Sequence, residues 1–177
     1  MVAKRTFPAE YAILGLLSQG PLHGYALRKR VDSALSSFWT IATSQIYSAL
    51  HSMQNEGLVS VEVQPQEGRP PRNVYLITQK GREEFDRWCA SPVRHLRDMR
   101  VEFLAKLYFV RLLGDESATA LIDDQMRFLQ RLRSRVSNRK ILKTDDPMLA
   151  ALASRFRDHQ ISAAIDWLAE CKEALVR

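Results

Sequence analysis

Cysteine is scarce in this chain of 177 residues, which contains only Cys89 and Cys171. They form neither a CxxC pair nor a Cys/His zinc spacing, so the pattern predicts ordinary thiols without a disulfide framework or a structural metal. No apolar run approaches the roughly 18 residues of a membrane span. The N-terminus lacks the apolar centre of a secretory signal, so we expect a cytoplasmic protein.

Acidic residues are outnumbered, because 26 Lys and Arg against 20 Asp and Glu give a net charge of +6. Such a charge favours an anionic partner without naming one. The first 90 residues carry 10 basic and 8 acidic groups, and the remaining 87 carry 16 and 12. The basic excess is therefore not concentrated in the first half, and charge alone does not predict a nucleic-acid binder.

The first 90 residues combine helical spacing with one strand–turn–strand pattern. Apolar periodicity predicts helices over residues 11–17 and 24–36. A third helix is expected to be capped by Thr43 or Ser44 and to run through Asn55, and a fourth to be capped by Thr78 and to reach about Ala90. Alternation predicts strands over Leu58–Gln64 and Asn73–Ile77, and the Pro- and Gly-rich segment between them, Pro65–Arg72, is expected to be a loop. This order is that of a winged helix-turn-helix.

The second half shows helical patterns only, after a hinge at Ser91-Pro92. Helices are expected over Arg97–Leu113, from Asp115, and from Asp146-Pro147 to the C-terminus. The predicted fold is mainly α: a winged helix-turn-helix domain of three helices and a two-stranded wing over residues 1–90, then an all-α dimerisation and effector domain over residues 91–177.

The predicted helices of the second half are broadly apolar, which favours a homodimer. A three-helix bundle that buries its own faces is the alternative. The last helix is expected to turn Leu152, Phe156, Ala164, Trp167, Leu168 and Leu175 inward. The residues predicted for the dimer interface are Phe103, Leu107, Tyr108, Leu168 and Leu175.

The predicted helix from residue 43 to 55 has short, neutral hydrogen-bonding side chains opposite its apolar face. Such side chains suit the major groove, where Gln and Ser contact base edges and hydroxyls contact phosphates. A solvated face would usually carry more Lys and Glu. Together with two arginines of the following loop, the predicted DNA-binding residues are Thr43, Ser44, Gln45, Tyr47, Ser48, His51, Arg69 and Arg72.

Residues 11–85 resemble the PadR family of bacterial transcriptional regulators. The residues that carry the resemblance are Ile13–Leu17, Pro21–Tyr25, Trp39, Ser44–Tyr47, Leu50, Glu56–Leu58, Gly68–Pro70, Arg72, Tyr75, Thr78 and Gly81. The second half is similar to the C-terminal domain that PadR proteins share with a virulence activator, chiefly through Glu102–Leu107. Ser48 departs from the family, which usually has proline there.

This resemblance implies a homodimer that binds a palindromic operator and releases it when a phenolic acid or another small aromatic binds. For such an effector, aromatic walls and one imidazole can hold an aromatic carboxylate. The alternative is that the aromatic residues belong to the core. The predicted effector-binding residues are Phe38, Trp39, Phe156, His159, Gln160 and Trp167.

The remaining residues bear on other classes of function. The basic run Arg127–Lys143 could contact flanking DNA or be a solvated helix face. No nucleophile–base pair, metal-ligand spacing or glycine-rich phosphate loop is present, so we expect neither an enzyme nor a cofactor. A winged-helix module that binds protein, or an activator without a small-molecule effector, is the alternative to a ligand-responsive repressor.

Overall fold

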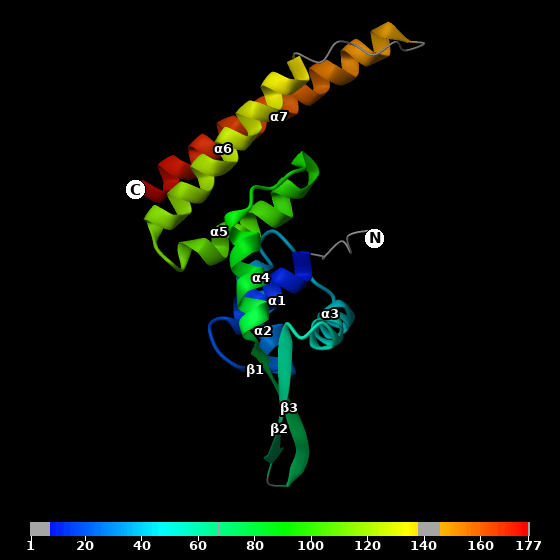
Figure 1. Ribbon diagram of the computed structural model, residues 1–177, viewed down its shortest axis with the longest axis vertical. Coiled ribbons are helices and arrows are strands. Elements are labelled where there is room, and N and C mark those ends of the chain that lie inside the picture. Colours follow the sequence, from blue (N-terminus) through cyan, green and yellow to red (C-terminus); the bar gives the residue numbers. More distant parts are fainter. Residues whose placement is uncertain (1–7, 67, 138–145, 177) are drawn as a thin grey trace. The chain divides into compact units, whose positions relative to one another are not determined.

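The computed structural model describes residues 8–66, 68–137 and 146–176 (Figure 1). The chain forms two compact units. The first comprises the residues up to Ser91 together with Arg100–Phe109, and the second comprises Pro92–Met99 and Val110–Arg177. Residues 100–109, expected in the C-terminal domain, thus belong to the compact unit of the N-terminal helices.

Four α-helices of the first unit confirm the expected element order, with small changes at their ends. They are α1 (Pro8–Leu17), α2 (Gly24–Leu35), α3 (Thr43–Asn55) and α4 (Gln79–Ala90). The apolar stripes predict the core correctly: α2 buries Leu27, Val31 and Leu35, and α3 buries Ile46, Ala49, Leu50 and Met53. Tyr25 is an exception, because its side chain is 73% exposed although it continues the α2 apolar spacing.

The helix ends explain where each helix begins and stops. Thr78 caps α4 as expected, because its Oγ1 accepts a hydrogen bond from the backbone N–H of Gly81. Gly57 ends α3 in the left-handed region, with φ of 70°. The expected cap of α3 was wrong: Ala42 occupies the N-cap position and has no capping oxygen, and Gln45 Oε1 accepts a hydrogen bond from the backbone N–H of Ala42.

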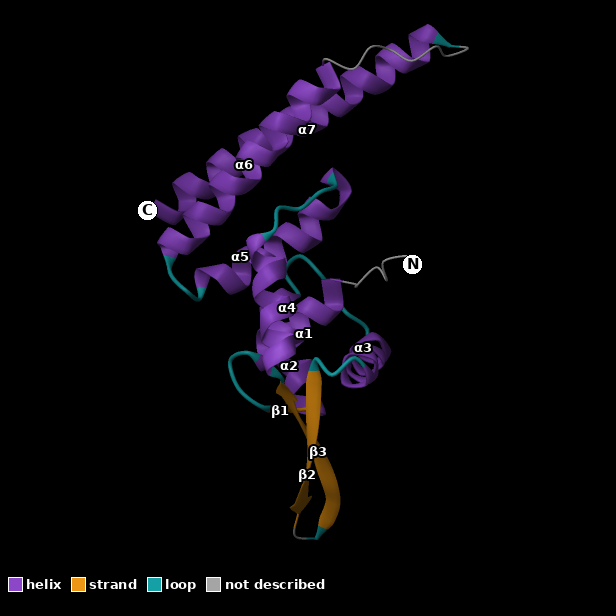
Figure 2. Ribbon diagram, in the orientation of Figure 1, coloured by secondary structure: helices purple, strands orange, loops and turns teal. Residues whose placement is uncertain are grey.

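The wing is longer than expected, because the Pro- and Gly-rich segment is mostly strand. Strands β2 (Val59–Gln66) and β3 (Arg69–Ile77) pair antiparallel and extend from the helices of this unit (Figure 2). The expected loop Pro65–Arg72 was wrong because the pairing register shifts between Gln64 and Gln66, so the prolines lie where the ladder is irregular. An unexpected short strand, β1 (Leu22–His23), completes the sheet in the order β1-β3-β2.

The expected single helix over Arg97–Leu113 is three helical segments. A 3-10 turn (Leu96–Asp98) leads into a π-helical segment (Met99–Phe103) and then α5 (Leu104–Arg111). Within the first unit, Phe109 of α5 contacts Phe85 of α4 edge-on, with ring centroids 5.4 Å apart. A Cβ on Gly15 of α1 would lie 2.6 Å from the Phe109 ring, so α1 approaches this aromatic pair closely.

The second unit is built on a helical hairpin. Helices α6 (Asp115–Ser137) and α7 (Pro147–Val176) lie side by side and antiparallel (Figure 1). Lys172 pairs with Asp123 at 2.7 Å, and Arg133 pairs with Asp158 at 2.8 Å. No described helix is both long and apolar enough to cross a membrane.

Two side chains of α7 expected to point inward are exposed. Leu152 is 50% exposed and Phe156 is 65% exposed, so the expectation was wrong for both residues in the single chain. Leu168 and Ile161 are fully buried, which shows that the hairpin core lies nearer the C-terminal half of α7.

Candidate nucleic-acid interface

Helix α3 presents a polar face without acidic residues. Ser44, Gln45, Ser48 and His51 are exposed, and Thr43 at the start of the helix is half-buried. The opposite face is fixed in the core, so this polar face keeps one orientation within the first unit. Its hydroxyl, amide and imidazole groups can donate and accept hydrogen bonds, as contacts with base edges and phosphates require.

Two of these polar side chains also make contacts within the helix. Gln45 Oε1 accepts a hydrogen bond from the backbone N–H of Ala42 at 3.1 Å. This bond orients the amide at the first turn of α3, and leaves its NH2 group as a donor toward solvent. His51 Nε2 lies 3.3 Å from Asn55 Nδ2, one turn further along. The structure therefore holds both ends of the polar face in a defined geometry.

Tyr47 connects the two helices of the helix-turn-helix. Its side chain is 46% exposed, and its ring lies against Gly24 at the start of α2. Tyr25, the next residue along α2, is the more exposed tyrosine. Sequence reasoning missed Tyr25 as a candidate contact because its place in the apolar spacing indicated a core residue.

The wing carries an exposed arginine, Arg72, on β3. Its Nε and one terminal nitrogen donate to Gln64 Oε1, at 3.3 and 3.1 Å, across the β2–β3 pair. This contact holds the exposed guanidinium above the ladder and leaves its other N–H groups available to an anion. Arg69 begins β3, and the placement of its side chain lies outside the described part of the structure.

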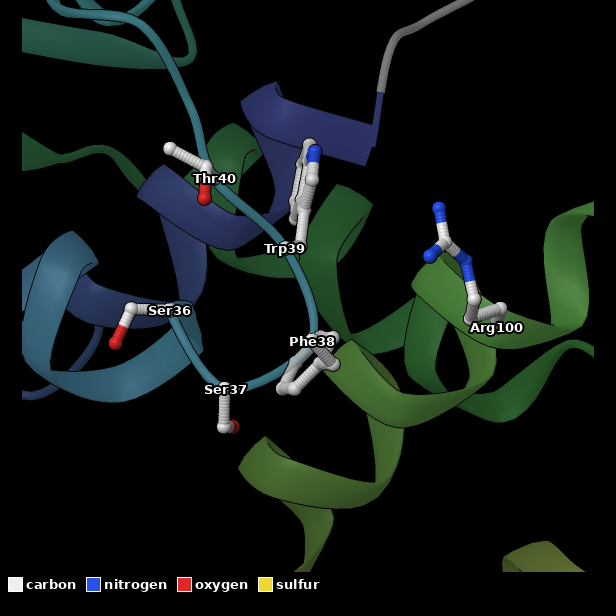
Figure 3. Close-up of a pocket in the computed structure, with 6 residues that line it drawn as sticks. All are labelled: Ser36, Ser37, Phe38, Trp39, Thr40 and Arg100. Carbon is white, nitrogen blue, oxygen red and sulfur yellow. The ribbon is translucent and has the colours of Figure 1, made fainter.

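A hollow of about 580 Å³ lies in the turn between α2 and α3. Its lining residues, Ser36, Ser37, Phe38, Trp39, Thr40 and Arg100, all belong to the first unit (Figure 3). Phe38 and Trp39, two of the predicted effector-binding residues, are thus brought together at one site. The other four predicted residues are on α7 of the second unit and do not line this hollow.

The α7 residues predicted to bind an effector differ in exposure. Phe156, His159 and Gln160 are exposed, and Trp167 is half-buried. Arg100 was missed by the sequence reasoning, because a single arginine in a long apolar segment carries no spacing signal. Only the folding of residues 100–109 into the first unit places Arg100 beside the turn.

Two of the residues predicted for the dimer interface are already covered in a single chain. Phe103 and Leu168 are fully buried, which corrects the expectation that they need a partner subunit. Leu107, Tyr108 and Leu175 are half-buried. Other large apolar side chains of the second unit are exposed, namely Leu112, Leu113, Met148, Leu149, Leu152 and Phe156.

The basic run Arg127–Lys143 is only partly described. Arg127 pairs with Asp124, and Arg133 pairs with Asp158, so these two guanidinium groups are engaged within the second unit. Asp158 raises the pKa of Arg133 through a hydrogen bond and its charge. Arg139, Lys140 and Lys143 lie outside the described residues. The role of the run in DNA binding stays a prediction.

A buried lysine, Lys106, lies in the first unit beside Trp88 of α4. Lys106 is 1% exposed, and its Nζ donates to the backbone oxygen of Ser91 at 2.5 Å and to Glu102 Oε1 at 3.1 Å. It also lies 5.0 Å from the ring centroid of Trp88, which itself donates to Glu102. Burial lowers the pKa of Lys106, and Glu102 opposes this effect.

Cys89 is half-buried and feels the charge of Lys106. Burial raises the pKa of its thiol to about 12, although the charge of Lys106 acts in the opposite direction. A protonated thiol is a poor nucleophile, which fits the expected ordinary thiol. Among the described residues, no group of three or more His, Cys, Asp or Glu side chains could hold a metal ion.

Comparisons with known proteins identify the family of this chain. Residues 13–87 match the transcriptional regulator PadR-like family. The chain is 31% identical to the negative transcriptional regulator PadR of Bacillus subtilis (strain 168), over 78% of each chain. It is 33% identical to the probable transcriptional regulator Rv1176c of Mycobacterium tuberculosis (strain ATCC 25618 / H37Rv), over 93% of this chain and 96% of the relative.

A crystal structure of Bacillus subtilis PadR in complex with operator DNA is also similar. It has a TM-score of 0.47 and 24% identity, and the match covers 92% of this chain and 97% of that chain. The resemblance of the second half to the virulence-activator domain stays a prediction. The sequence relatives and the family match establish that this chain belongs to the PadR-like family of transcriptional regulators, which are DNA-binding proteins and not enzymes.

Proposed function

We propose that this protein is a homodimeric repressor that binds an inverted-repeat operator and releases it when a small aromatic acid binds. The observation that carries the proposal is the neutral polar face of α3, exposed opposite a buried apolar face. Such a face can enter the major groove of duplex DNA without repulsion from acidic side chains. Since its proposed partner is chromosomal DNA, we expect the protein in the cytoplasm.

The base-reading residues are those at the start and middle of α3. Gln45 and Ser48 contact base edges, with Thr43, Ser44 and His51 toward the phosphates. Tyr47 lies at the boundary between α2 and α3, where a hydroxyl can reach the backbone of the DNA. These assignments are supported by the position of all six side chains on the same helix, where five are exposed and Thr43 is half-buried.

The wing supplies backbone contacts. Arg69 and Arg72 bind phosphates or the minor groove beside the site read by α3. The bond from Arg72 to Gln64 supports this role, because it limits the side-chain freedom that is lost when a phosphate binds. Phosphate contacts of this kind add affinity and strong salt dependence, and little sequence preference.

The dimer is proposed to form through the second unit. The α7 residues Met148, Leu149, Leu152 and Phe156 follow helical spacing and are at least 50% exposed. A stripe of this length, unusual on a monomer, supports contact with a second copy. Two copies of α3 related by a two-fold axis would enter successive major grooves about 34 Å apart, which requires an inverted repeat.

The repressor role is supported by the sequence relationship to a negative transcriptional regulator. A phenolic acid or a similar small aromatic is the proposed effector, and the hollow at the α2–α3 turn contains Phe38 and Trp39 as aromatic walls. An activator without such an effector is the second candidate function. One measurement separates the activator from the ligand-responsive repressor: the operator affinity of the activator would not change when aromatic acids are added.

The deciding experiment is footprinting of upstream DNA with and without aromatic acids. We expect protection of an inverted repeat that random competitor DNA does not remove. Gln45→Glu keeps an oxygen acceptor for the Ala42 N–H and removes the amide donor, so it should weaken operator binding much more than non-specific binding. Gln54→Ala, at an exposed position near the end of α3, is the matched control. Equal losses on specific and random DNA would reject base reading by Gln45.

A further inference from the structure

The two histidines of the helix-turn-helix accept hydrogen bonds through different ring nitrogens. His23 is the N-cap of α2, and its Nδ1 accepts a hydrogen bond from the backbone N–H of Ala26 at 3.2 Å. His51 is on the polar face of α3, and its Nε2 lies 3.3 Å from Nδ2 of Asn55, one helical turn further along. Because a backbone N–H and an amide NH2 group can only donate, each of these two ring nitrogens is an acceptor.

The contact with Asn55 determines which group His51 presents to its surroundings. A neutral imidazole has one ring proton, so a ring that accepts at Nε2 carries its proton on Nδ1. Within the described part of the chain, Nδ1 of His51 has no hydrogen-bond partner, and the side chain is exposed. His51 therefore presents an N–H donor at Nδ1, whereas His23 carries its proton on Nε2.

A donor at this position suits the DNA backbone. Ser44, Ser48 and His51 follow helical spacing on one exposed face of α3, and Asn55 continues this face by one turn. Phosphate oxygens accept hydrogen bonds and do not donate them. With its proton on Nε2, the ring would offer a lone pair at Nδ1, which cannot bind a phosphate oxygen. The tautomer that Asn55 selects is thus the one that matches a phosphate.

We infer that Asn55 is a positioning residue for DNA binding, because it holds His51 in the tautomer that donates from Nδ1 to a phosphate of the operator. This inference rests on the proposed function, in which α3 enters the major groove. Asn55 is the last residue of α3 and was not among the predicted DNA-binding residues. It acts through His51 and makes no contact with DNA of its own.

Nitrogen-15 NMR of the full-length protein tests the tautomer without DNA. Correlations between ring nitrogens and carbon-bound ring protons distinguish Nδ1–H from Nε2–H at pH 8, where an imidazole is ordinarily neutral. His51→Gln identifies the His51 signals by their loss, and His23 is an internal reference of the opposite tautomer. We expect Nδ1–H on His51, and an increased share of Nε2–H in Asn55→Leu, which removes the amide donor.

Operator binding measures the consequence in a double-mutant cycle. Asn55→Leu should raise the operator Kd about threefold, since the hydrogen bond from His51 to the phosphate weakens. In the His51→Ala background the same change should have no effect, because the group through which Asn55 acts is absent. Gln54→Ala, at the neighbouring exposed position, is the matched control and should change neither the tautomer nor the affinity.

A methylphosphonate scan of the operator identifies the acceptor. One substituted phosphate in each half-site should weaken binding by the unchanged protein and have no effect on His51→Ala. If replacement of a purine N7 by carbon gives this pattern instead, His51 donates to a base and the assignment to a phosphate is wrong.

Contrary results of the other measurements differ in what they overturn. Nε2–H on His51 in the unchanged protein contradicts the inference, and so does a spectrum that Asn55→Leu leaves the same. If the effect of Asn55→Leu persists in His51→Ala, Asn55 contacts DNA itself and is not a positioning residue. If the tautomer changes but operator affinity does not, the inference fails while base reading by Gln45 stands. If the unchanged protein binds no operator, the proposed function fails as well.

Discussion

Tyr47 of α3 lies directly over Gly24, the first residue of α2. A Cβ placed on Gly24 would be 2.9 Å from the Tyr47 hydroxyl oxygen and 3.0 Å from its ring. The two helices of the helix-turn-helix therefore meet through a tyrosine ring at a position without a side chain. Because Tyr47 remains 46% exposed, this contact positions the ring without burying it.

Gly24→Ala should displace Tyr47 and weaken operator binding with little loss of stability. The clash involves the far end of a side chain that can move, so the free energy of unfolding should change by about 1 kcal/mol or less. Loss of one positioned contact should weaken operator affinity about fivefold. Gel shifts and urea denaturation measure the two effects, and Ser33→Ala at an exposed position of α2 is the control. Unchanged operator affinity would show that Tyr47 does not need this position.

Gly81→Ala is the contrasting substitution, because its new Cβ would meet backbone. It would lie 2.2 Å from the carbonyl oxygen of Leu58, and neither the start of β2 nor the first turn of α4 can move freely. We expect the protein to lose about 2–3 kcal/mol of unfolding free energy, as overpacked sites do. Urea denaturation of Gly81→Ala beside Gly24→Ala provides the comparison. If both variants unfold at the same urea concentration, the close approach of α4 to Leu58 is contradicted.

The predictions that proved correct concern features that residues close together in the sequence determine. The faces of α2 and α3 follow from apolar spacing, and the cap of α4 follows from one threonine. The cap of α3 could not be found in the same way, since Ala42 has no capping atom and Gln45 acts from three residues ahead. The prolines of the wing predict a loop from the sequence. The pairing of β2 with β3 shifts in register at these prolines, and this shift cannot be read from the sequence.

The candidate site was predictable where it lies on one helix. The exposed polar face of α3 can be read from the sequence because its opposite face is apolar. The hollow at the α2–α3 turn cannot, since Arg100 lines it beside Phe38 and Trp39 only when residues 100–109 fold with the first unit. Tyr25 was missed for the opposite reason: its apolar spacing is correct, but the core does not extend to the start of α2.

Arg72→Gln should reduce the salt dependence of DNA binding. Each phosphate contact that is lost lowers the slope of log K against log salt by about one unit. The slope should fall on operator and random DNA alike, because phosphates carry no sequence information. Arg87→Gln is the control, since Arg87 is an exposed arginine that pairs with Glu84 on α4. An unchanged slope for Arg72→Gln would remove Arg72 from the interface.

A double substitution of Leu152 and Phe156 by glutamate should separate the proposed dimer. Both side chains are at least half exposed on α7, so the single chain has little packing to lose. Sedimentation at micromolar concentration should change from dimer to monomer, while the helical circular dichroism signal stays the same. Arg155→Glu, between the two positions, is the control. A persistent dimer would place the interface elsewhere on the chain.

Cys89 should make the protein lose stability at alkaline pH. In an unfolded chain the thiol ionises near pH 9.0, whereas burial raises the pKa of Cys89 in the folded protein to about 12. Between these values the unfolded chain binds fewer protons than the folded protein, so stability falls as pH rises. The contribution is fully present below pH 9.0, and its loss can reach about 1.4 kcal/mol per pH unit above it.

Cys89→Ala should therefore show a shallower decline of unfolding free energy between pH 9 and 10.5 than the unchanged protein. Lys106 acts in the opposite direction in both proteins, because its lowered pKa makes stability rise with pH below 10.5. Urea denaturation at half-unit pH steps measures the difference in slope, and Cys171→Ala provides a thiol control from the second unit. If the curves of Cys89→Ala and the unchanged protein run parallel, the thiol is not held protonated by burial, and access of solvent to this part of the core must be greater than its packing indicates.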